Sequence, residues 1–538
     1  SPSPSLEPER DWAPDSRRPS ARAAARALME AAPPAAQRQR GTRALLELAR
    51  DLTRDAARRA GEHLDADRLL VHAMDGAIEL AASRYALDPG AQWSPGQPLR
   101  VLLAGYCGTR NTGADVRVEE MIRQLRHLFG DEHLSLSVFT IDPALTRGYF
   151  RTARQLHLPK LFPRFVVDAV HDHHAVLACE GSMFKSKFAN ALTVMMVGAL
   201  GVASVEQKLA VGYGGEAGEM DPAIRDLVRR RCRDAFVVTR NEASRALLTE
   251  LGIEAATGTD TAWTFEPAPR EVGEAVLRRA GWDGTTPVLA LCPINAYWWP
   301  VKPRVGRALE LAVSGVEDDA HYGSVYFHRD DAETDARQRR YIDALAGAVR
   351  AFRARHAVFP VLIGSEQLDR RACEALDEAL GGGHPVIVSD AHDMYEMVSV
   401  MRCASLMLSS RYHAIVTSMP AGVPSAGVTM DERIRNLMAD RGQPELSIDV
   451  DAPDLEARCL AALEHLWAEP EAVRAAIERS VADHLERMGS MGALLIDRVR
   501  AAHPELPLRP GLGAGGDPWA HLPALSPSLR ALVERSRA

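Results

Sequence analysis

Short apolar runs alternate with amphipathic helical stretches twice along this chain, and this alternation constrains its fold more than any other feature. The runs that predict strands are residues 99–106, 134–142, 175–181, 207–215 and 234–241, and then 287–295, 357–365, 384–390 and 405–428. Such alternation is typical of βαβ units, which build parallel sheets covered by helices. The sequence therefore predicts an α/β fold with two doubly wound, Rossmann-like domains that face each other across a cleft.

The segments outside these two blocks have a different composition and extend the domain plan. Residues 1–20 are rich in Pro, Ser and charge, which predicts disorder, and residues 21–98 are expected to form a helical extension and linker. The expected boundaries that follow are 99–268 for the first Rossmann-like domain, 269–450 for the second, 451–503 for C-terminal helices and 504–538 for an irregular tail.

Two apolar stripes in the helical extension need a surface to cover them. They consist of Leu45, Leu46, Leu48 and Leu52, and of Leu69, Leu70, Val71 and Met74. Short isolated helices are marginal in water, so such stripes are buried by docking or by self-association. We expect docking onto the α/β core, with the helices after Asp454 as the neighbouring surface; a homo-oligomer is the alternative.

Composition excludes several classes of function. The formal charge is −8, from 64 basic and 72 acidic residues, so no global basic field would attract nucleic acid. The seven cysteines are scattered without a CxxC pair, which favours a reducing, cytoplasmic environment over a disulfide scaffold or a structural zinc site. The most apolar run, residues 191–205, is shorter than the roughly 20 residues that a membrane span needs. The first residues show no signal-peptide pattern.

Arg411 and His413 form the most informative pair of polar residues. They follow the strand predicted for LMLSS (406–410), just before a predicted helix. Ligands of open α/β sheets bind outside the carboxyl ends of strands. An arginine there can clamp a phosphate or carboxylate, and a histidine can give or take a proton. The alternative is a buried Arg–His pair that only caps the helix.

Other candidates also follow predicted strands. Arg240 follows AFVVT (235–239) at the end of the fifth run and would face the same cleft as Arg411. Asn111 and Gly113 shape the loop after the first run, and Glu180 closes the third. Glu180 could orient His413 or remove a proton from an acceptor. A packed arginine, a plain strand-to-helix turn and a helix cap are the corresponding structural alternatives.

Three aromatic or histidine-containing segments are less specific. Trp298 lies in a Tyr-Trp-Trp run whose rings suit sugars but also suit a core, and His328 follows a predicted strand. The HDHH stretch at residues 171–174 lacks a second acidic ligand at metal-site spacing, so we expect no metal site there.

Four motifs in order resemble the polysaccharide pyruvyl transferase family. SSRYHAIVTSMPAGVPSAGVTMDERIRNLM (409–438) resembles the C-terminal signature of that family, and GYCGTRNTGAD (105–115) its first loop. ACEGSMF (178–184) is similar to its third strand end, and VTRNEASRALLTELGI (238–253) to its Arg-containing element. The chain departs from the family pattern at Ala114, which precedes Asp115, at Cys179 and Glu180, at Asn241, and at Arg433, where lysine is common.

The resemblance implies an enzyme that moves the pyruvyl group of phosphoenolpyruvate onto a sugar diol and forms a cyclic ketal. We take His413, Glu180 and Asp115 as the catalytic residues, with His413 as general acid toward the methylene carbon or the departing phosphate. The residues expected to bind substrate are Arg411, Arg240, Asn111, Gly113, Ser182, Trp298 and His328. The acceptor would be a sugar or glycan; a lipid-linked one would bring the protein to the inner face of the membrane. No redox cofactor or metal is implied.

Two other functions fit the same sequence. A glycosyltransferase of the glycosyltransferase-B type, which uses a nucleotide sugar, would have much the same architecture, because fold alone does not settle function. Against it, no clear Glu or Asp follows the last strand to hold a ribose. A catalytically inactive glycan-binding module is the third interpretation, and the presence of both Arg411 and His413 argues against it.

Overall fold

The computed structural model describes residues 65–314, 318–513 and 515–537. The chain divides into two units: Ala66–Pro303 with Ala320–Ala538, and Ser1–Asp65 with Arg304–Asp319. The second of these contains helix α10 (Val305–Ser314). The first, called the main unit, contains both parallel sheets. The predicted disorder of residues 1–20 and the stripe at Leu45–Leu52 lie outside the described residues.

The first half of the main unit is built on a seven-stranded parallel sheet with the order β3-β2-β1-β4-β5-β6-β7. Its strands are β1 (Leu99–Ala104), β2 (Leu134–Thr140), β3 (Arg154–His157), β4 (Ala175–Ala178), β5 (Leu209–Gly215), β6 (Phe236–Thr239) and β7 (Glu254–Thr257). The central strands are buried and apolar, as expected for a parallel sheet covered on both faces. The edge strands β3 and β7 are polar, and sequence analysis missed them.

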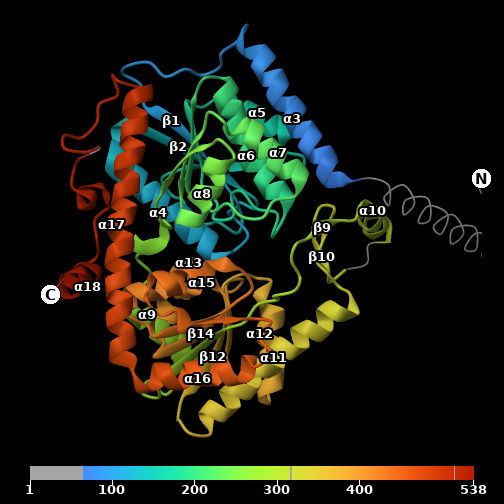
Figure 1. The fold of residues 1–538 in the computed structure, drawn as a ribbon, viewed down its shortest axis with the longest axis vertical. Coiled ribbons are helices and arrows are strands. Elements are labelled where there is room, and N and C mark those ends of the chain that lie inside the picture. Colours follow the sequence, from blue (N-terminus) through green and yellow to red (C-terminus); the bar gives the residue numbers. More distant parts are fainter. Residues whose placement is uncertain (1–64, 315–317, 514, 538) are drawn as a thin grey trace, which may run out of the picture. The chain divides into compact units, whose positions relative to one another are not determined.

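Helices cover this sheet: α4 (Thr112–Phe129), α5 (Pro163–His171), α6 (Asn190–Val205), α7 (Pro222–Arg231) and α8 (Glu242–Glu250). The apolar run at 191–205 is α6, a buried helix. Helix α3 (Ala66–Tyr85), the described part of the predicted extension, packs against α5, α6 and α7 (Figure 1). The expectation that the extension docks next to the helices after Asp454 is thus wrong for α3, because its apolar side, Met74 and Ile78, fits against glycines of α6.

The second half is built on a six-stranded parallel sheet with the order β13-β12-β8-β14-β15-β16. Its strands are β8 (Val288–Cys292), β12 (Phe359–Gly364), β13 (Val386–Val388), β14 (Leu406–Ser409), β15 (Ser425–Thr429) and β16 (Ser447–Asp449). Its helices are α9 (Arg270–Arg279), α11 (Ala332–Arg353), α12 (Asp369–Leu380), α13 (Met394–Arg402), α14 (Tyr412–Ser418), α15 (Glu432–Asp440) and α16 (Leu455–Ala468). A small antiparallel sheet, β9 (Lys302–Pro303), β10 (His321–Gly323) and β11 (Tyr326–Phe327), is inserted after β8.

A long helix, α17 (Pro470–Ala502), runs along both halves (Figure 1). The tail after residue 504, expected to be irregular, contains the short helix η5 (Pro518–His521) and α18 (Pro527–Arg537), and both pack on α17. The reason is a helical spacing of apolar residues in α18, since Leu529, Leu532 and Val533 are buried.

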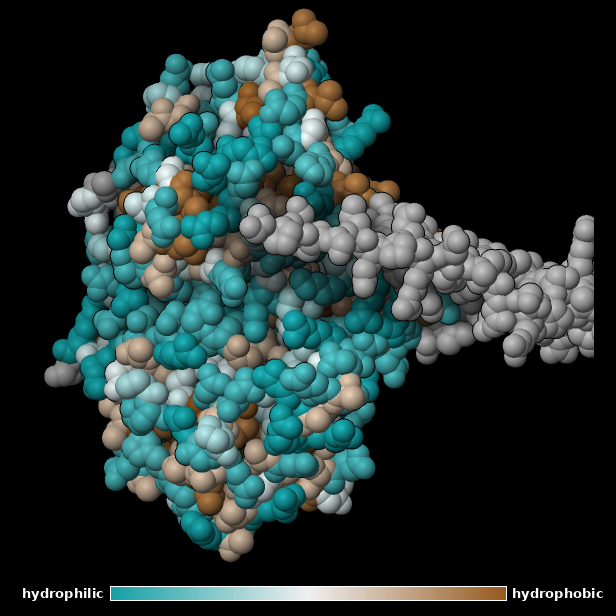
Figure 2. Space-filling model, turned by 45° about the vertical axis from the view of Figure 1, so that its right-hand side comes forward, coloured by the Kyte–Doolittle hydropathy of each residue, from teal (hydrophilic) through white to brown (hydrophobic). Residues whose placement is uncertain are grey.

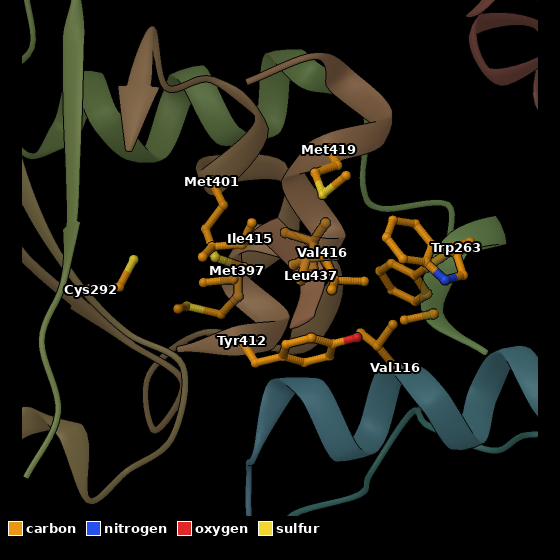
Figure 3. Close-up of a cluster of buried hydrophobic side chains, with 14 of the residues drawn as sticks. Val116, Trp263, Cys292, Met397, Met401, Tyr412, Ile415, Val416, Met419 and Leu437 are labelled. Atoms are coloured by element: carbon orange, nitrogen blue, oxygen red, sulfur yellow. The ribbon is translucent and has the colours of Figure 1, made fainter. Parts of the chain in front are cut away.

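The two halves share a buried apolar seam, shown in Figure 3. Ile415 and Val416 of α14 and Met419 of the short helix η3 (Met419–Ala421) come from the second half. Val116 of α4 and Trp263 of the short helix η2 (Ala262–Thr264) come from the first. All five side chains are buried. The seam fixes α14, and with it the start of that helix, against α4.

The surface in view in Figure 2 is mostly hydrophilic. Among the described residues of the main unit, the exposed large hydrophobic side chains are Leu69, Leu80, Leu87 and Leu161. No helix in the described part of the chain combines the length and the apolar character of a transmembrane segment. The predicted α/β fold with two parallel, Rossmann-like sheets and a helix before the first strand is confirmed.

Candidate functional site

A small pocket of about 60 Å³ lies where the carboxyl ends of strands from both sheets meet. It is lined by Asn111, Gly113, Ala114, Glu180, Gly181, Ser182, Arg240, Ile294, Ser365, Ser410, Arg411, Tyr412, His413, Met430 and Arg433. These residues follow β1, β4, β6, β8, β12, β14 and β15. The pocket therefore occupies the position at which open α/β sheets bind ligands. Of the predicted site residues, Asp115, Trp298 and His328 are not in its lining.

On the side of the pocket that the first half forms, the buried carboxylate of Asp260 contacts two arginines and one histidine. Asp260 Oδ2 lies 3.0 Å from Arg117 Nε, 3.2 Å from Arg240 Nε and 3.1 Å from His413 Nε2. The Asp260 side chain is fully buried. Burial by itself would raise the pKa of Asp260, but Arg117, His413 and Arg240 together hold this pKa well below its usual range. Asp260 is therefore ionised.

His413 reaches across from α14 to the start of α4. Burial lowers the pKa of His413 to about 4, with Asp260 acting in the opposite direction. The imidazole is thus neutral near pH 7. Any side chain at Gly113 would collide with Nδ1 and Cγ of the His413 ring, which explains a glycine at this position of α4.

Arg240 presents its guanidinium to the pocket with part of its donor capacity unused. The group stacks over the ring of Tyr412 at 4.7 Å and touches Gly181, where a side chain would collide with Nη2. Nη1 has no hydrogen-bond partner among the described residues. Buried donors are normally satisfied, so an unsatisfied guanidinium nitrogen in a pocket wall indicates an anion that binds there.

Arg411 has different surroundings from those that the sequence suggested. Its Nε donates to Asp369 Oδ2 at 2.8 Å and its Nη2 to Glu366 Oε2 at 2.8 Å. Both carboxylates are buried and come from the segment after β12. The bidentate clamp is therefore made, but on carboxylates of the protein itself, and these neutralise much of the charge of Arg411.

A further ion pair, between Lys185 and Glu432, crosses between the halves and was not found from the sequence. Buried Lys185 binds Glu216 at 2.8 Å and also Glu432 at the start of α15. Arg433 pairs with Asp431 at 2.8 Å and lies over the ring of Phe188 at 4.8 Å. These contacts hold the loop after β15, and with it Arg433, at the pocket.

Three more of the predicted site residues, Asn111, Asp115 and Glu180, follow strands β1 and β4. Asn111 caps α4, accepting a hydrogen bond from Ala114 N at 3.2 Å. Asp115 is buried behind this loop and accepts a hydrogen bond from Gly108 N at 3.2 Å; burial raises its pKa to about 7. Burial also raises the pKa of Glu180, whose Oε2 has no hydrogen-bond partner among the described residues. The carboxylate that holds His413 is Asp260, not Glu180.

Trp298 and His328 belong to an aromatic cluster beside the pocket. Their rings lie 4.5 Å apart, and Trp299 and Tyr322 lie 5.1 and 5.2 Å from His328. Burial lowers the pKa of His328 to about 4.

The cluster continues to the pocket wall. The ring of Phe188 contacts that of Trp299 at 5.3 Å and also lies under the guanidinium of Arg433. The hydroxyl of Tyr322 lies 2.7 Å from that of Tyr106. A contiguous band of half-buried aromatic rings therefore leads from Arg433 to His328.

The HDHH segment makes ordinary structural contacts. His173 binds Ser137 Oγ at 2.8 Å, and His174 accepts a hydrogen bond from the backbone N–H of Arg100 at 3.0 Å. Within the described ranges, no three His, Cys, Asp or Glu side chains are grouped as metal ligands.

Fold and pocket together define an α/β protein of glycosyltransferase-B-like architecture. Residues 208–432 match the model of the family described as polysaccharide pyruvyl transferase. Over this range, the resemblance inferred from the motifs is confirmed. Comparison with curated proteins gives no match.

Several solved structures share the general arrangement. UDP-GlcNAc 2-epimerase from Neisseria meningitidis bound to UDP-GlcNAc is 11% identical with a TM-score of 0.44, covering 75% of this chain and 100% of its own. A glycosyltransferase from Rickettsia africae ESF-5 is 7% identical with a TM-score of 0.46, covering 76% and 99%. UDP-GlcNAc 2-epimerase from Methanocaldococcus jannaschii is 11% identical with a TM-score of 0.44, covering 68% and 92%. These similarities concern the course of the chain only.

Proposed function

We propose that the protein transfers the pyruvyl group of phosphoenolpyruvate to two hydroxyls of a sugar or glycan, forming a cyclic ketal and releasing phosphate. The observation that carries the proposal is the pairing of Arg240 and His413 on one buried carboxylate, in a pocket at the strand ends. A guanidinium with unused donors suits an anionic donor, and a neutral imidazole beside it suits proton transfer.

On the donor side, Arg240 binds the phosphate together with Ser182 and the loop of Asn111 and Gly113. Arg411 contributes less charge to the pocket than Arg240, because Asp369 and Glu366 already neutralise it. In this assignment Arg411 shapes the pocket and reaches the donor only when Glu366 is released.

The chemistry requires two proton exchanges. Protonation of the methylene carbon makes the neighbouring carbon electrophilic, one sugar hydroxyl attacks, phosphate leaves, and the second hydroxyl closes the ketal. His413 and Glu180 line the pocket and supply these exchanges; burial raises the pKa of Glu180. Asp115 supports the loop from behind. The proposed steps need neither a metal nor a redox cofactor.

On the acceptor side, we assign the sugar to the aromatic band that includes Trp298 and His328. Aromatic faces stack well on the apolar faces of sugar rings. The band adjoins the pocket through Phe188 and Arg433, so a sugar stacked there has its hydroxyls directed toward the donor site.

The test is a mass-spectrometric assay with phosphoenolpyruvate and cell-envelope glycan fragments, free and lipid-linked. We expect an acceptor that gains the mass of pyruvic acid less one water, with one phosphate released per transfer. A hexose gained from a nucleotide sugar, without reaction of phosphoenolpyruvate, would replace this function by glycosyl transfer. Binding of glycans without any turnover would indicate a binding module.

A further inference from the structure

We infer that Asp260 is a positioning residue that holds His413 as the tautomer protonated on Nε2, so that Nδ1 accepts the proton of the attacking hydroxyl. The inference rests on the proposed function for the identity of the reaction. It decides a point that the motifs leave open, namely whether His413 first gives or first takes a proton.

The tautomer follows from the contact geometry. Asp260 Oδ2 lies 3.1 Å from His413 Nε2, and an ionised carboxylate can only accept a hydrogen bond. Nε2 therefore carries the proton of the neutral ring, and Nδ1 carries a lone pair. Nδ1 is the nitrogen next to Gly113, whose loop lines the pocket. A neutral histidine in this orientation offers the pocket an acceptor and not a donor.

Burial is the main reason why the ring of His413 rests neutral, and the positive charges of Arg240 and Arg117 act in the same direction. Arg117 from α4 and Arg240 from the end of β6 both contact Asp260, so this cluster is already net positive before His413 is protonated. The other titratable groups facing the pair are Tyr412 on α14, His484 on α17 and Glu180 across the pocket. Burial raises the pKa of Glu180, whereas Arg117 and Arg240 act in the opposite direction.

An anion in the pocket reverses this balance. A bound donor phosphate beside Arg240 adds negative charge, which favours the imidazolium that forms when Nδ1 takes a proton. His413 accepts the proton of the first hydroxyl as its oxygen bonds to the electrophilic carbon, and returns it to the departing phosphate. The proton on the methyl group comes from Glu180, which the second hydroxyl reprotonates. Two hydroxyl protons thus account for one new C–H bond and one proton on phosphate.

The direct test is nitrogen NMR of the full-length chain labelled with ¹⁵N-histidine, with His413→Gln to assign the signal. At pH 7, without substrate, we expect the His413 signals of the Nε2-protonated tautomer. Titration with inorganic phosphate should raise the pKa of His413. A signal from the Nδ1-protonated tautomer in the wild type would overturn the inference, whatever reaction the protein performs.

The kinetic test uses Asp260→Asn, with Glu120→Gln as a matched control. Glu120 is another buried, ion-paired carboxylate, held by Arg123 at 2.9 Å, and it does not belong to the pocket lining. We expect Asp260→Asn to lower kcat by about 10²–10⁴-fold, as loss of an orienting carboxylate does in catalytic triads. The affinity for phosphoenolpyruvate should stay equal or rise, because a negative charge beside Arg240 is lost.

A merely structural role for Asp260 predicts a different pattern. Both variants would then lose thermal stability and activity together, with unchanged pH dependence of kcat. We expect instead that only Asp260→Asn changes the tautomer signal and the pH profile. Retention of more than a third of kcat by Asp260→Asn would overturn the inference. If no acceptor is pyruvylated at all, the proposed function fails, and the NMR measurement still decides the tautomer.

Discussion

Arg240 and Arg411 show how the same residue type acquires different roles from its partners. Arg411 meets two buried carboxylates, Asp369 and Glu366, whereas Arg240 shares the single carboxylate of Asp260 with Arg117 and His413. The two carboxylates compensate the charge of Arg411, whereas Arg240 retains positive charge for a ligand. This difference leads to opposite expectations for their removal.

Arg240→Ala should weaken binding of phosphoenolpyruvate about 10- to 150-fold, because it removes charge-assisted hydrogen bonds of roughly 1.5–3 kcal/mol. Arg411→Ala should weaken binding less but lower the free energy of unfolding by about 3–5 kcal/mol, since it leaves buried carboxylates unpaired. Calorimetric titration and thermal unfolding measure the two effects. Equal donor affinity of Arg240→Ala and wild type would make Arg240 a structural residue.

His413→Ala should abolish turnover while donor affinity stays within about tenfold of wild type, because a proton-transfer group acts mainly in the transition state. Steady-state kinetics with phosphate release as the readout, together with calorimetry, provide both numbers. A variant that kept a tenth of the wild-type kcat would remove His413 from the mechanism.

At the scale of elements, α3 is bound to the first half by apolar contacts and by ion pairs. Met74 and Ile78 fit against Gly198 and Gly201 of α6, where no side chain intervenes. Arg231 pairs with Asp75 on α3 at 2.5 Å. The helix therefore covers the apolar surface of α6, which would otherwise face water.

A chain that begins near Gln97 should keep donor binding, because the pocket is built without α3, but should aggregate or melt at a lower temperature. Light scattering and thermal unfolding of the truncated and full chains measure this. Unchanged melting of the truncated chain would show that α3 contributes nothing to the stability of the core.

Gly198→Leu should lower the free energy of unfolding by about 1–3 kcal/mol, because the added side chain collides with Met74. The matched control is Gly76→Leu on α3, an exposed position with nothing within 4 Å of an added Cβ. The control should be neutral or slightly stabilising, since leucine favours helix over glycine. Equal destabilisation by both changes would refute this packing of α3 on α6.

At the scale of the whole unit, a buried histidine of α17 anchors this long helix on the first half. His484 stacks on Trp263 at 4.3 Å and binds Thr259 Oγ1 at 2.7 Å. Burial lowers the pKa of His484 to about 3. Since an unfolded histidine has a pKa of about 6.5, the unfolded state takes up this proton first as the pH falls.

The stability that neutral His484 contributes is therefore present above pH 6.5 and is lost as the pH falls toward 3. A His484→Phe variant lacks this titration. Between pH 7 and 5, wild type should lose about 2 kcal/mol more free energy of unfolding than the variant. Urea unfolding of both proteins at the two pH values tests this, and an equal loss in both would show that His484 does not titrate in this way.

Sequence alone determined the apolar strands of both sheets and the residues that follow them. The core strands are recognisable because both faces are buried, which demands continuous apolar runs. The edge strands β3, β7 and β16 were missed because their exposure permits polar residues. Arg240, Glu180, Arg411 and His413 were found because the carboxyl ends of parallel strands gather at one edge.

Only the tertiary structure decided which charges meet at that edge. Asp260 lies 153 positions from His413 and follows the polar strand β7, so no strand-end argument pointed to it. Arg117 lies on α4, where the sequence suggests an ordinary amphipathic helix. Arg411 and Arg240 have similar contexts in sequence. Folding nevertheless pairs Arg411 with two carboxylates and leaves Arg240 with guanidinium donors that have no partner among the described residues. An ion pair forms only when two side chains come within about 3–4 Å of each other. Segments that are distant in the chain reach this distance only once both sheets are packed on their common seam.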